Sequence, residues 1–374
     1  MKISENWLRT WVNPAVDSNT LSDQLTMLGL EVDDLSPAAK PFTGVVVGEV
    51  LTVEQHPDAD RLRVTTVNIG SGEPLQIVCG APNVRVGMKA PVATIGAVLP
   101  GDFKIKKGKL RGIESQGMLC GASEIDLEDK IDGLLELAVD APVGVDIREY
   151  LNLDDHVIDI SITPNRGDCF SIRGIAREIG VINQLTVTAP EINAVAATIA
   201  DEKKVVVSTE GCPRYLGRVI KNVNTKAATP EWMERALVRS GIRQHSILVD
   251  ITNYVLMELG QPLHAFDAAK IQGSVQVRQA NTAEKLVLLN EQEVELNEKV
   301  MVIADDEKAL AIAGIMGGLS SSVTDETQDI FLESAFFAPL AIAGRARSFG
   351  LHTDASQRYE RGVDFELPML AMHR

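Results

Sequence analysis

The first forty residues have the hydrophobic spacing of two short helices. Trp7, Leu8 and Trp11 form one apolar face at positions i, i+1 and i+4. Thr20 and Asp23 resemble a capping box, which predicts that Thr20 begins the second helix. The apolar positions of that helix, the glycine that ends it and the prolines that follow are Leu21, Leu25, Leu28, Gly29, Pro37 and Pro41.

From about Phe42 the pattern changes from helical spacing to the period of strands, and it returns to helical spacing near Asp146. The apolar or alternating runs between these points are residues 45–50, 61–67, 75–78 and 103–106. Five or so strands over about 110 residues, with glycine-rich turns, favour a small Greek-key barrel.

Helical spacing then continues to a predicted linker. Asp168 is predicted to cap a helix that carries three isoleucines and ends at Gly180. Residues 187–201 contain alanine and proline without periodicity and are typical of a linker.

Beyond the linker the pattern mixes helix and strand. Thr229 as N-cap and Pro230 at the first helical position predict a helix that ends at Gly241. Strand-like runs follow at 274–277, 285–289, 300–303 and 309–312. Turns at 290–291 and 305–306 predict that three of these runs form hairpins.

The net charge of −16, from 52 acidic and 36 basic residues, repels nucleic acid on average. Any contact with RNA must therefore be local. One basic cluster falls within eight residues, at Lys104, Lys106, Lys107, Lys109 and Arg111. These side chains either lie on one strand and contact successive phosphates of an RNA, or they only increase the solubility of an edge strand. Both interpretations stay open.

Cysteine usage and the N-terminus bear on the compartment. Cys79, Cys120, Cys169 and Cys212 are about forty residues apart and show no C-x-x-C pair, so we expect buried or half-buried thiols and no structural metal. There is no 18-residue apolar run and no apolar core of a signal peptide, which leads us to expect a cytoplasmic protein that does not bind membranes.

Several catalytic signatures are missing. The sequence has no Walker A loop, no G-x-G-x-x-G and no G-x-S-x-G, and it shows no signature of amino-acid activation. We therefore expect no aminoacyl-adenylate chemistry in this chain.

Five motifs in order resemble one family. They are residues 241–246 (GIRQHS), 249–255 (VDITNYV), 260–267 (GQPLHAFD), 312–318 (IAGIMGG) and 353–364 (TDASQRYERGVD). Together they resemble the β subunit of bacterial phenylalanyl-tRNA synthetase, over the whole of residues 1–374. Residues 56–62 and 112–118 resemble the tRNA-binding OB-fold module that several synthetases carry. Family chains are longer, so we expect this one to be an N-terminal part.

The resemblance implies an α+β multidomain fold. Residues 1–39 and 151–190 would form a small helical or mixed N-terminal domain in two halves, with an OB-fold barrel at 40–150 inserted between them. Residues 200–374 would form a mixed α/β editing domain.

The resemblance also implies a function. In the family, the α subunit makes the aminoacyl-adenylate and the β subunit hydrolyses mischarged Tyr-tRNA(Phe). The implied partners are tRNA(Phe) and the α subunit, in a heterotetramer of two α and two β chains, with no DNA. ATP and Mg²⁺ are implied for the whole enzyme and no cofactor for this part.

A second site is needed on physical grounds. An apolar pocket for phenylalanine rejects the added hydroxyl of tyrosine only about a hundredfold, whereas a site that hydrogen-bonds a phenol rejects phenylalanine by roughly 10⁴–10⁵. By resemblance, the residues that line such a pocket here are Arg243, His264, Gly317, Glu333, Thr353 and Ala355.

Each of these residues also has a plainer interpretation. Glu333 accepts the phenol's hydrogen bond or is a surface glutamate that ends a strand. His264 is aimed by a tight turn after Pro262 to position the ester or the terminal adenosine, or it is a structural histidine. Arg243 meets a phosphate or ribose, or is a solvated residue at a helix end. Gly317 allows close approach of a ligand or belongs to a turn.

Thr353 and Ala355 shape the amino-acid end of the pocket in one interpretation and form a helix cap and first turn in the other; both can hold. No nucleophile–base pair is visible, so we expect a site that positions water beside the ester. The rival hypothesis is a non-catalytic module for tRNA binding and assembly.

Overall fold

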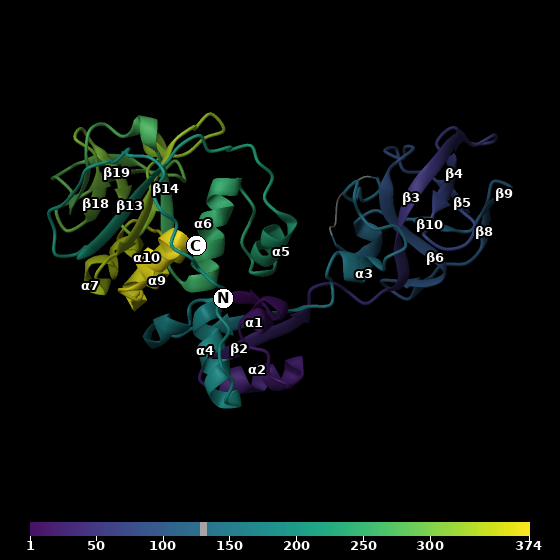
Figure 1. Ribbon diagram of the computed structural model, residues 1–374, viewed down its shortest axis with the longest axis horizontal. Coiled ribbons are helices and arrows are strands. Elements are labelled where there is room, and N and C mark those ends of the chain that lie inside the picture. The colour runs from purple at the N-terminus through teal and green to yellow at the C-terminus, as the bar shows by residue number, and fades with distance from the viewer. Residues whose placement is uncertain (128–132) are drawn as a thin grey trace. The chain divides into compact units, whose positions relative to one another are not determined.

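A computed structural model describes residues 1–127 and 133–374, and it divides the chain into two compact units. Unit 1 combines Met1–Leu35 with Val157–Arg374, and unit 2 is Ser36–His156. Both units mix helices and strands and are rich in strands (Figure 1).

The N-terminal part of unit 1 is a three-stranded sheet with helices against it. The strands are β1 (Lys2–Ser4), β11 (His156–Ser161) and β2 (Glu31–Pro37), in the order β1-β11-β2. The helices are α1 (Glu5–Trp11), α2 (Ser18–Met27), the 3₁₀ turn η2 (Pro164–Cys169) and α4 (Ile172–Asn183). Lys2 pairs with Asp159 and α4 packs on α1 and α2, so the segments 1–39 and 151–190 are in contact.

Three predicted helix starts are wrong, two because of neighbouring residues in the sequence and one because of a tertiary bond. Asp17, not Thr20, caps α2, because its carboxylate accepts from the Thr20 N–H at 2.8 Å. Ser171 caps α4, because the carboxylate of Asp168 is bound to Arg166 instead. That helix also runs past Gly180 to Asn183.

The third wrong start is that of α5 (Glu231–Arg239). Pro230 is its N-cap residue, and Thr229 lies outside the helix. The Thr229 hydroxyl donates instead to the buried carboxylate of Asp250 at 2.6 Å.

Unit 2 is a curled antiparallel sheet. Its strands are β3 (Thr43–Gln55), β4 (Arg63–Asn68), β5 (Leu75–Cys79), β6 (Lys89–Leu99), β7 (Phe103–Lys104) and β10 (Gly117–Leu119), in the order β10-β6-β3-β4-β5 with β7 on β6. The two ends of this order meet, since the Gln116 N–H donates to the Gln76 carbonyl at 2.8 Å. A hairpin of β8 (Gly108–Leu110) and β9 (Ile113–Ser115), the turn η1 (Ser123–Ile125) and α3 (Ile147–Tyr150) complete the unit.

The predicted strand 103–106 is shorter than expected. The strand β7 contains only Phe103 and Lys104, although Ile105 still exchanges backbone hydrogen bonds with Gly96 and Ala97 of β6. The chain then turns away, and Gly108 opens the β8–β9 hairpin. The buried side chain of Ile105 anchors the bend between them. The basic cluster therefore spans two strands and the loop between them.

The C-terminal part of unit 1 holds two larger sheets. The first contains β12 (Val205–Val207), β15 (Val275–Gln279), β18 (Met301–Ala304), β19 (Ala309–Ile312) and β20 (Met316–Gly317), in that order. The second contains β13 (Arg214–Ile220), β21 (Ile330–Phe336) and β14 (Leu263–Asp267), in that order. Buried side chains of both sheets form one hydrophobic core between them.

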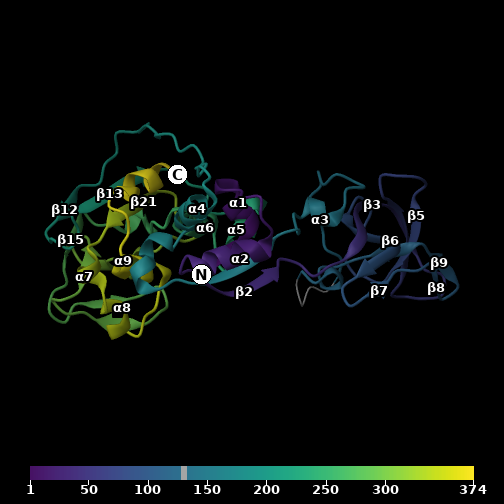
Figure 2. The ribbon, with the colours of Figure 1, turned by 90° about the horizontal axis from the view of Figure 1, so that it is seen from below.

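Helices flank these sheets. Helices α6 (Ile247–Leu259) and α10 (Leu367–His373) pack on the second sheet, and α9 (Asp354–Arg361) lies beside the short helix α7 (Pro339–Ile342), as Figure 2 also shows. The remaining short elements are η3 (Ala268–Lys270), η4 (Leu319–Ser321) and α8 (Arg345–Ser348).

One predicted hairpin joins different strands from those expected. The turn at 290–291 connects β16 (Lys285–Val287) to β17 (Glu293–Glu295), and not to the run at 300–303. The turn at 305–306 does connect β18 to β19, as predicted.

A second core explains why unit 1 is not divided further. It combines Trp7, Leu8 and Ile175 of the N-terminal part with Leu237 of α5 and Ala371 of α10. Since the same buried side chains serve both parts of unit 1, the parts pack as one body.

Candidate functional site

A small cavity of about 80 Å³ lies between the two C-terminal sheets and α9. It has room for several water molecules. Its lining residues come from β14, β18–β20, β21 and α9: Pro262, Leu263, His264, Ile303, Ala311, Ile312, Ala313, Gly314, Ile315, Met316, Gly317, Glu333, Ala355 and Tyr359.

Glu333 stands in the middle of β21, so the interpretation as a surface glutamate at a strand end is wrong. It pairs with Gly217 of β13 on one side and with His264 of β14 on the other. Directly opposite residues of antiparallel strands present their side chains on the same face, so Glu333 and His264 point to the same side of the sheet. Glu333 is 7% exposed.

The carboxyl group of Glu333 is bound to a phenol of the protein itself. The hydroxyl of Tyr215 donates to Oε2 of Glu333 at 2.7 Å. Burial raises the pKa of Glu333 to about 7, and the bond from Tyr215 limits that rise. Burial and the neighbouring Glu333 raise the pKa of Tyr215 well above its usual value, so this phenol stays a donor at neutral pH.

His264 lies within strand β14. The interpretation that a tight turn directs its ring is therefore wrong. Burial lowers the pKa of its imidazole to about 4, so the ring is neutral at physiological pH. Its Nε2 is buried and has no hydrogen-bond partner among residues 1–127 and 133–374. A buried polar atom without a partner is costly, which makes Nε2 a candidate ligand contact.

Gly317 is required by the position of that ring. A Cβ added at Gly317 would lie 2.5 Å from Cε1 of His264, closer than any side chain allows. The edge of Phe266 meets the same ring, with centroids 4.4 Å apart. Gly317 and Phe266 therefore fix the imidazole beside Glu333.

Thr353 and Ala355 belong to the start of α9, and the capping role predicted for Thr353 is confirmed. Its side chain and that of Ser356 form a reciprocal capping box. The Thr353 hydroxyl also donates to the Ile315 carbonyl at 2.8 Å, which ties α9 to the cavity wall. Ala355 is half-buried and lines the cavity.

Arg243 is not brought to the cavity. It is an exposed residue in the loop between α5 and α6 and is absent from the lining. Of the six residues expected at the pocket, His264, Gly317, Glu333 and Ala355 line it, and Thr353 contacts its wall.

Two tyrosines were not predicted. Tyr215 reaches Glu333 from β13, a strand that the pattern analysis did not identify. Tyr359 donates to the Ala335 carbonyl at 3.0 Å and accepts from Gln261 at 3.1 Å. Alternation along 214–220 is the signal that would have placed Tyr215 on the same face as Gly217.

The lining combines a titratable carboxyl group, a neutral imidazole and apolar walls. None of its described residues is a serine, cysteine or lysine. A water or ester group could be held between Glu333 and His264, but nothing there forms a nucleophile activated by a base. The arrangement suits binding and positioning.

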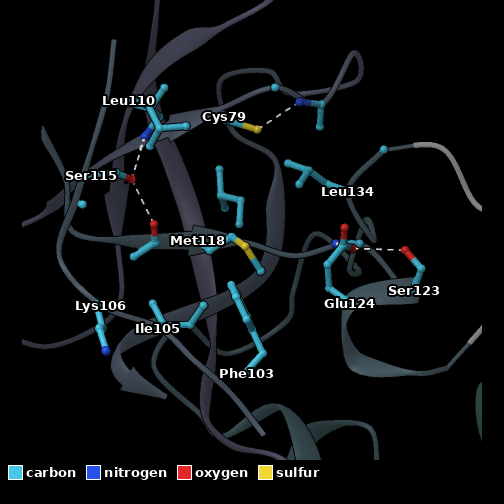
Figure 3. A pocket seen from close by; sticks show the side chains of 18 of the residues that line it. Cys79, Phe103, Ile105, Lys106, Leu110, Ser115, Met118, Ser123, Glu124 and Leu134 are labelled. Atoms are coloured by element: carbon cyan, nitrogen blue, oxygen red, sulfur yellow. Dashed lines mark hydrogen bonds between the residues drawn. The ribbon is translucent and has the colours of Figure 1, made fainter. Parts of the chain in front are cut away.

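Unit 2 carries a separate cavity of about 610 Å³. Figure 3 shows Phe103, Ile105 and Met118 gathered on one side of it, while the ammonium group of Lys106 points away from Met118. All five residues of the predicted basic cluster are exposed, and Lys107 is paired with Glu114 at 2.8 Å. Lys104 and Lys106 are the members that line the cavity.

The four cysteines are free and buried, as predicted. Burial raises the pKa of the Cys120 thiol to about 12, which makes it unreactive. Among the described residues, no helix is long and apolar enough to cross a membrane.

Comparison with known proteins assigns both regions to families. Residues 45–146 match the model of a putative tRNA binding domain, and residues 211–374 match the model of the B3/4 domain. The chain therefore joins a putative tRNA binding domain, which covers most of unit 2, to a B3/4 domain, which contains the Glu333 cavity.

Relatives identify the family itself. The chain is 82% identical to the phenylalanine–tRNA ligase beta subunit of Acinetobacter baylyi, over 100% of this chain and 47% of that one. It is 66% identical to the beta subunit of the same name from Psychrobacter arcticus, over 100% of this chain and 48% of that one. The chain belongs to the phenylalanine–tRNA ligase beta-subunit family, and it spans about half the length of these curated relatives.

A solved structure is similar at a much lower level. It is an N-terminal fragment of the phenylalanyl-tRNA synthetase beta subunit from Pyrococcus horikoshii, with 15% identity and a TM-score of 0.29, over 53% of this chain and 61% of that one. A likeness this low says nothing further about the fold.

Proposed function

We propose that this chain is the part of a phenylalanine–tRNA ligase beta subunit that hydrolyses mischarged Tyr-tRNA(Phe). The observation that carries the proposal is the bond from the Tyr215 phenol to the buried carboxyl group of Glu333. It demonstrates within the protein that this carboxyl group accepts a phenol's hydrogen bond inside an apolar cavity.

Selectivity follows from the second carboxylate oxygen. Tyr215 occupies Oε2 and orients the carboxyl group, which leaves Oε1 for the phenol of an incoming tyrosyl group. A phenylalanyl group has no donor for that oxygen. It would leave Oε1 of the desolvated carboxyl group without a donor, and such a loss discriminates between substrates.

Hydrolysis requires little more than positioning. The free Nε2 of His264 lies on the same face as Glu333, and as a neutral imidazole it can hold the ribose end or a water molecule beside the ester. A correctly placed water gains most of its advantage from orientation, so no protein nucleophile is needed.

Unit 2 is proposed to be an OB-fold that contacts tRNA. The support is the match of residues 45–146 and the exposed Lys104, Lys106, Lys109 and Arg111 on an otherwise acidic chain. In the same proposal, unit 2 is inserted between the two halves of an N-terminal domain at 1–39 and 151–190, and 200–374 is the editing domain.

The whole enzyme is proposed to be cytoplasmic and to contain two α and two β chains. Its α subunit would use ATP and Mg²⁺ to charge tRNA(Phe). The rival function, a non-catalytic module for tRNA binding and assembly, requires a domain without convergent polar groups, whereas Glu333 and His264 converge in the cavity.

The test is direct. The chain is incubated with Tyr-tRNA(Phe) and with Phe-tRNA(Phe), and loss of each ester is followed against a protein-free blank. We expect the tyrosyl ester to be lost much faster than in the blank and the phenylalanyl ester to be nearly unaffected. Equal, blank-level loss of both esters would favour the non-catalytic module.

A further inference from the structure

A second cavity of unit 1, separate from the one that holds Glu333, has the composition of an anion site. It measures about 450 Å³ and lies at the N-terminal end of α4, beside the end of α6 and the segment after α9. Its lining residues are Asn165, Gly167, Asp168, Ser171, Arg173, Arg177, Leu259, Gly260, Arg361, Gly362, Val363, Asp364 and Leu367.

Three guanidinium groups converge on this cavity. Arg173 and Arg177 are four residues apart on α4, so they lie on the same face of the helix. Arg361 is the last residue of α9 and reaches the cavity from the other side. Burial, followed by the charge of Arg177, lowers the pKa of Arg173, and the charge of Asp364 opposes this only in part.

The acidic neighbours compensate these groups only in part. Asp364 is 3.9 Å from Arg173, too far for a hydrogen bond, and Arg173 makes none with the described part of the chain. Asp168 is engaged by Arg166 at 3.1 and 3.2 Å, and Arg177 bonds only its backbone carbonyl.

Arg361 is held in place, and one of its N–H groups lacks an acceptor. Its Nη1 donates to the Ile162 carbonyl at 3.1 Å, and its guanidinium group lies over the Phe170 ring, 5.0 Å from the centroid. Its Nε is buried without a partner among the residues that the structure describes. A fixed, desolvated N–H that lacks an acceptor points to a ligand that supplies one.

We propose that this cavity binds a phosphate group of the RNA backbone. The proposal rests on the proposed function, in which the substrate is a tRNA. A phosphodiester presents two charged oxygens that match the forked donors of arginine, and several arginines can share them. On a chain of net charge −16, a phosphate contact must lie at a local cluster of this kind.

The size of the cavity also favours a phosphate over the carboxylate of a protein partner. A volume of about 450 Å³ is much larger than a single carboxylate needs, and it accommodates a phosphate with its attached sugar. A carboxylate would satisfy one guanidinium group and leave the others without an acceptor.

The experiment measures the affinity of the chain for uncharged tRNA(Phe) over a series of salt concentrations. The test variant is Arg173→Gln with Arg177→Gln. The matched control is Arg235→Gln with Lys299→Gln, which removes two positive charges from unit 1 outside the cavity. A second pair, Arg173→Lys with Arg177→Lys, keeps the charges.

We expect the glutamine pair to weaken binding and to reduce the slope of log K against log salt by about 0.7 to 0.9 for each lost contact. The control should keep the parental slope, and the lysine pair should keep most of it. A glutamine pair with the parental slope would overturn the proposal and favour an acidic protein partner. Should that pair not fold, Arg177→Gln alone gives the same test, because this side chain is exposed.

Failure of the site and failure of the proposed function give different results. Suppose that the parent hydrolyses Tyr-tRNA(Phe) and that the glutamine pair has the parental salt slope. This result contradicts the phosphate site but not the proposed function. If the parent neither binds nor hydrolyses tRNA, inorganic phosphate is the probe. Phosphate should then raise the melting temperature of the parent above that in chloride of equal ionic strength, and not that of the glutamine pair. No such difference would also overturn the site.

Discussion

The bond between Tyr215 and Glu333 is the most informative contact at the scale of single residues. It joins two side chains that are far apart in sequence and places a phenol donor on a buried carboxyl group at 2.7 Å. The same bond limits the rise in the pKa of Glu333, so Tyr215 controls how much of the carboxyl group is ionised at neutral pH.

Tyr215→Phe should therefore raise the pKa of Glu333 above about 7, because the bond that lowers it is lost while burial remains. The pH dependence of Tyr-tRNA(Phe) hydrolysis should shift upward, and selectivity for the tyrosyl ester should fall as the carboxyl group loses its fixed orientation. Rates measured from pH 5.5 to 8.5 check this. A pH profile identical to the parent's would mean that Tyr215 does not act on Glu333.

Stability should depend on pH through Glu333. Its folded pKa of about 7 exceeds its ordinary value of 4.5, so its contribution is fully present below about pH 4.5 and is lost as the pH rises through 7. The loss is on the order of 3 kcal/mol at most. Glu333→Gln removes it, so the free energy of unfolding of this variant, relative to the parent, should improve between pH 4.5 and 8. Denaturant unfolding at a series of pH values measures that difference.

The contribution of His264 to the free energy of unfolding depends on pH in the opposite direction, so it must be separated from that of Glu333. Its folded pKa of about 4 lies below 6.5, so its contribution is present above pH 6.5 and is lost as the pH falls through 4. Subtracting the parent curve from the Glu333→Gln curve cancels this effect. A difference that does not change with pH would show that Glu333 is not ionised by pH 8.

At the scale of elements, the start of α9 fixes one wall of the cavity. Thr353 caps the helix and donates to the Ile315 carbonyl, so one side chain serves both the helix and the turn before β20. The capping role could be predicted from the sequence because Thr353 and Ser356 are only three residues apart. The bond to Ile315 was not, since it depends on tertiary packing.

Thr353→Ala should destabilise the chain by about 1 to 3 kcal/mol, since it removes an N-cap and leaves a carbonyl without its donor. Thr353→Ser keeps the hydroxyl and is the matched control. Thermal or denaturant unfolding of the three proteins provides the measurement. If the serine variant lost as much stability as the alanine variant, the hydroxyl would not be the cause.

The same distinction between local and tertiary information explains the other outcomes. The apolar runs of β5 and β19 were predicted close to their observed positions, whereas β3 (Thr43–Gln55) extends well beyond the predicted run at 45–50. The caps at Thr20, Asp168 and Thr229 were wrong for three different reasons. Asp17 caps the helix before Thr20, Arg166 binds the Asp168 carboxylate, and the Thr229 hydroxyl bonds Asp250, which is 21 residues away. The pairing of Glu333 with Gly217 and His264 depends on strand register, which a pattern of apolar residues does not reveal.

At the scale of the whole molecule, the chain is acidic, with 52 acidic and 36 basic residues, so each basic cluster is a candidate contact for RNA. In unit 2 the exposed Lys104 and Lys106 line the cavity of about 610 Å³. Lys107 is partly neutralised by Glu114. If unit 2 contacts RNA, the unpaired lysines should contribute most of the salt dependence.

Lys104→Ala with Lys106→Ala should weaken tRNA binding and flatten its salt dependence by about 0.9 log unit per lost contact on a duplex stem. Lys107→Ala should have a smaller effect, because its charge is already paired. Binding titrations with tRNA at several salt concentrations measure the effect of the double variant and of Lys107→Ala. Equal effects of all three lysines would indicate a general loss of charge, and no effect would leave them as groups that only aid solubility.

The central claim is that Glu333 selects tyrosine by accepting the phenol's hydrogen bond. The most direct measurement is the ratio of hydrolysis rates for Tyr-tRNA(Phe) and Phe-tRNA(Phe), in the parent, in Glu333→Ala and in the exposed control Glu307→Ala. Glu333→Ala should remain folded and lower the ratio by roughly tenfold to a hundredfold, the worth of a charged hydrogen bond of about 1.5–3 kcal/mol. Glu307→Ala should keep the parental ratio. A Glu333→Ala variant that hydrolyses the tyrosyl ester with the parent's rate and ratio would contradict the assignment of this cavity.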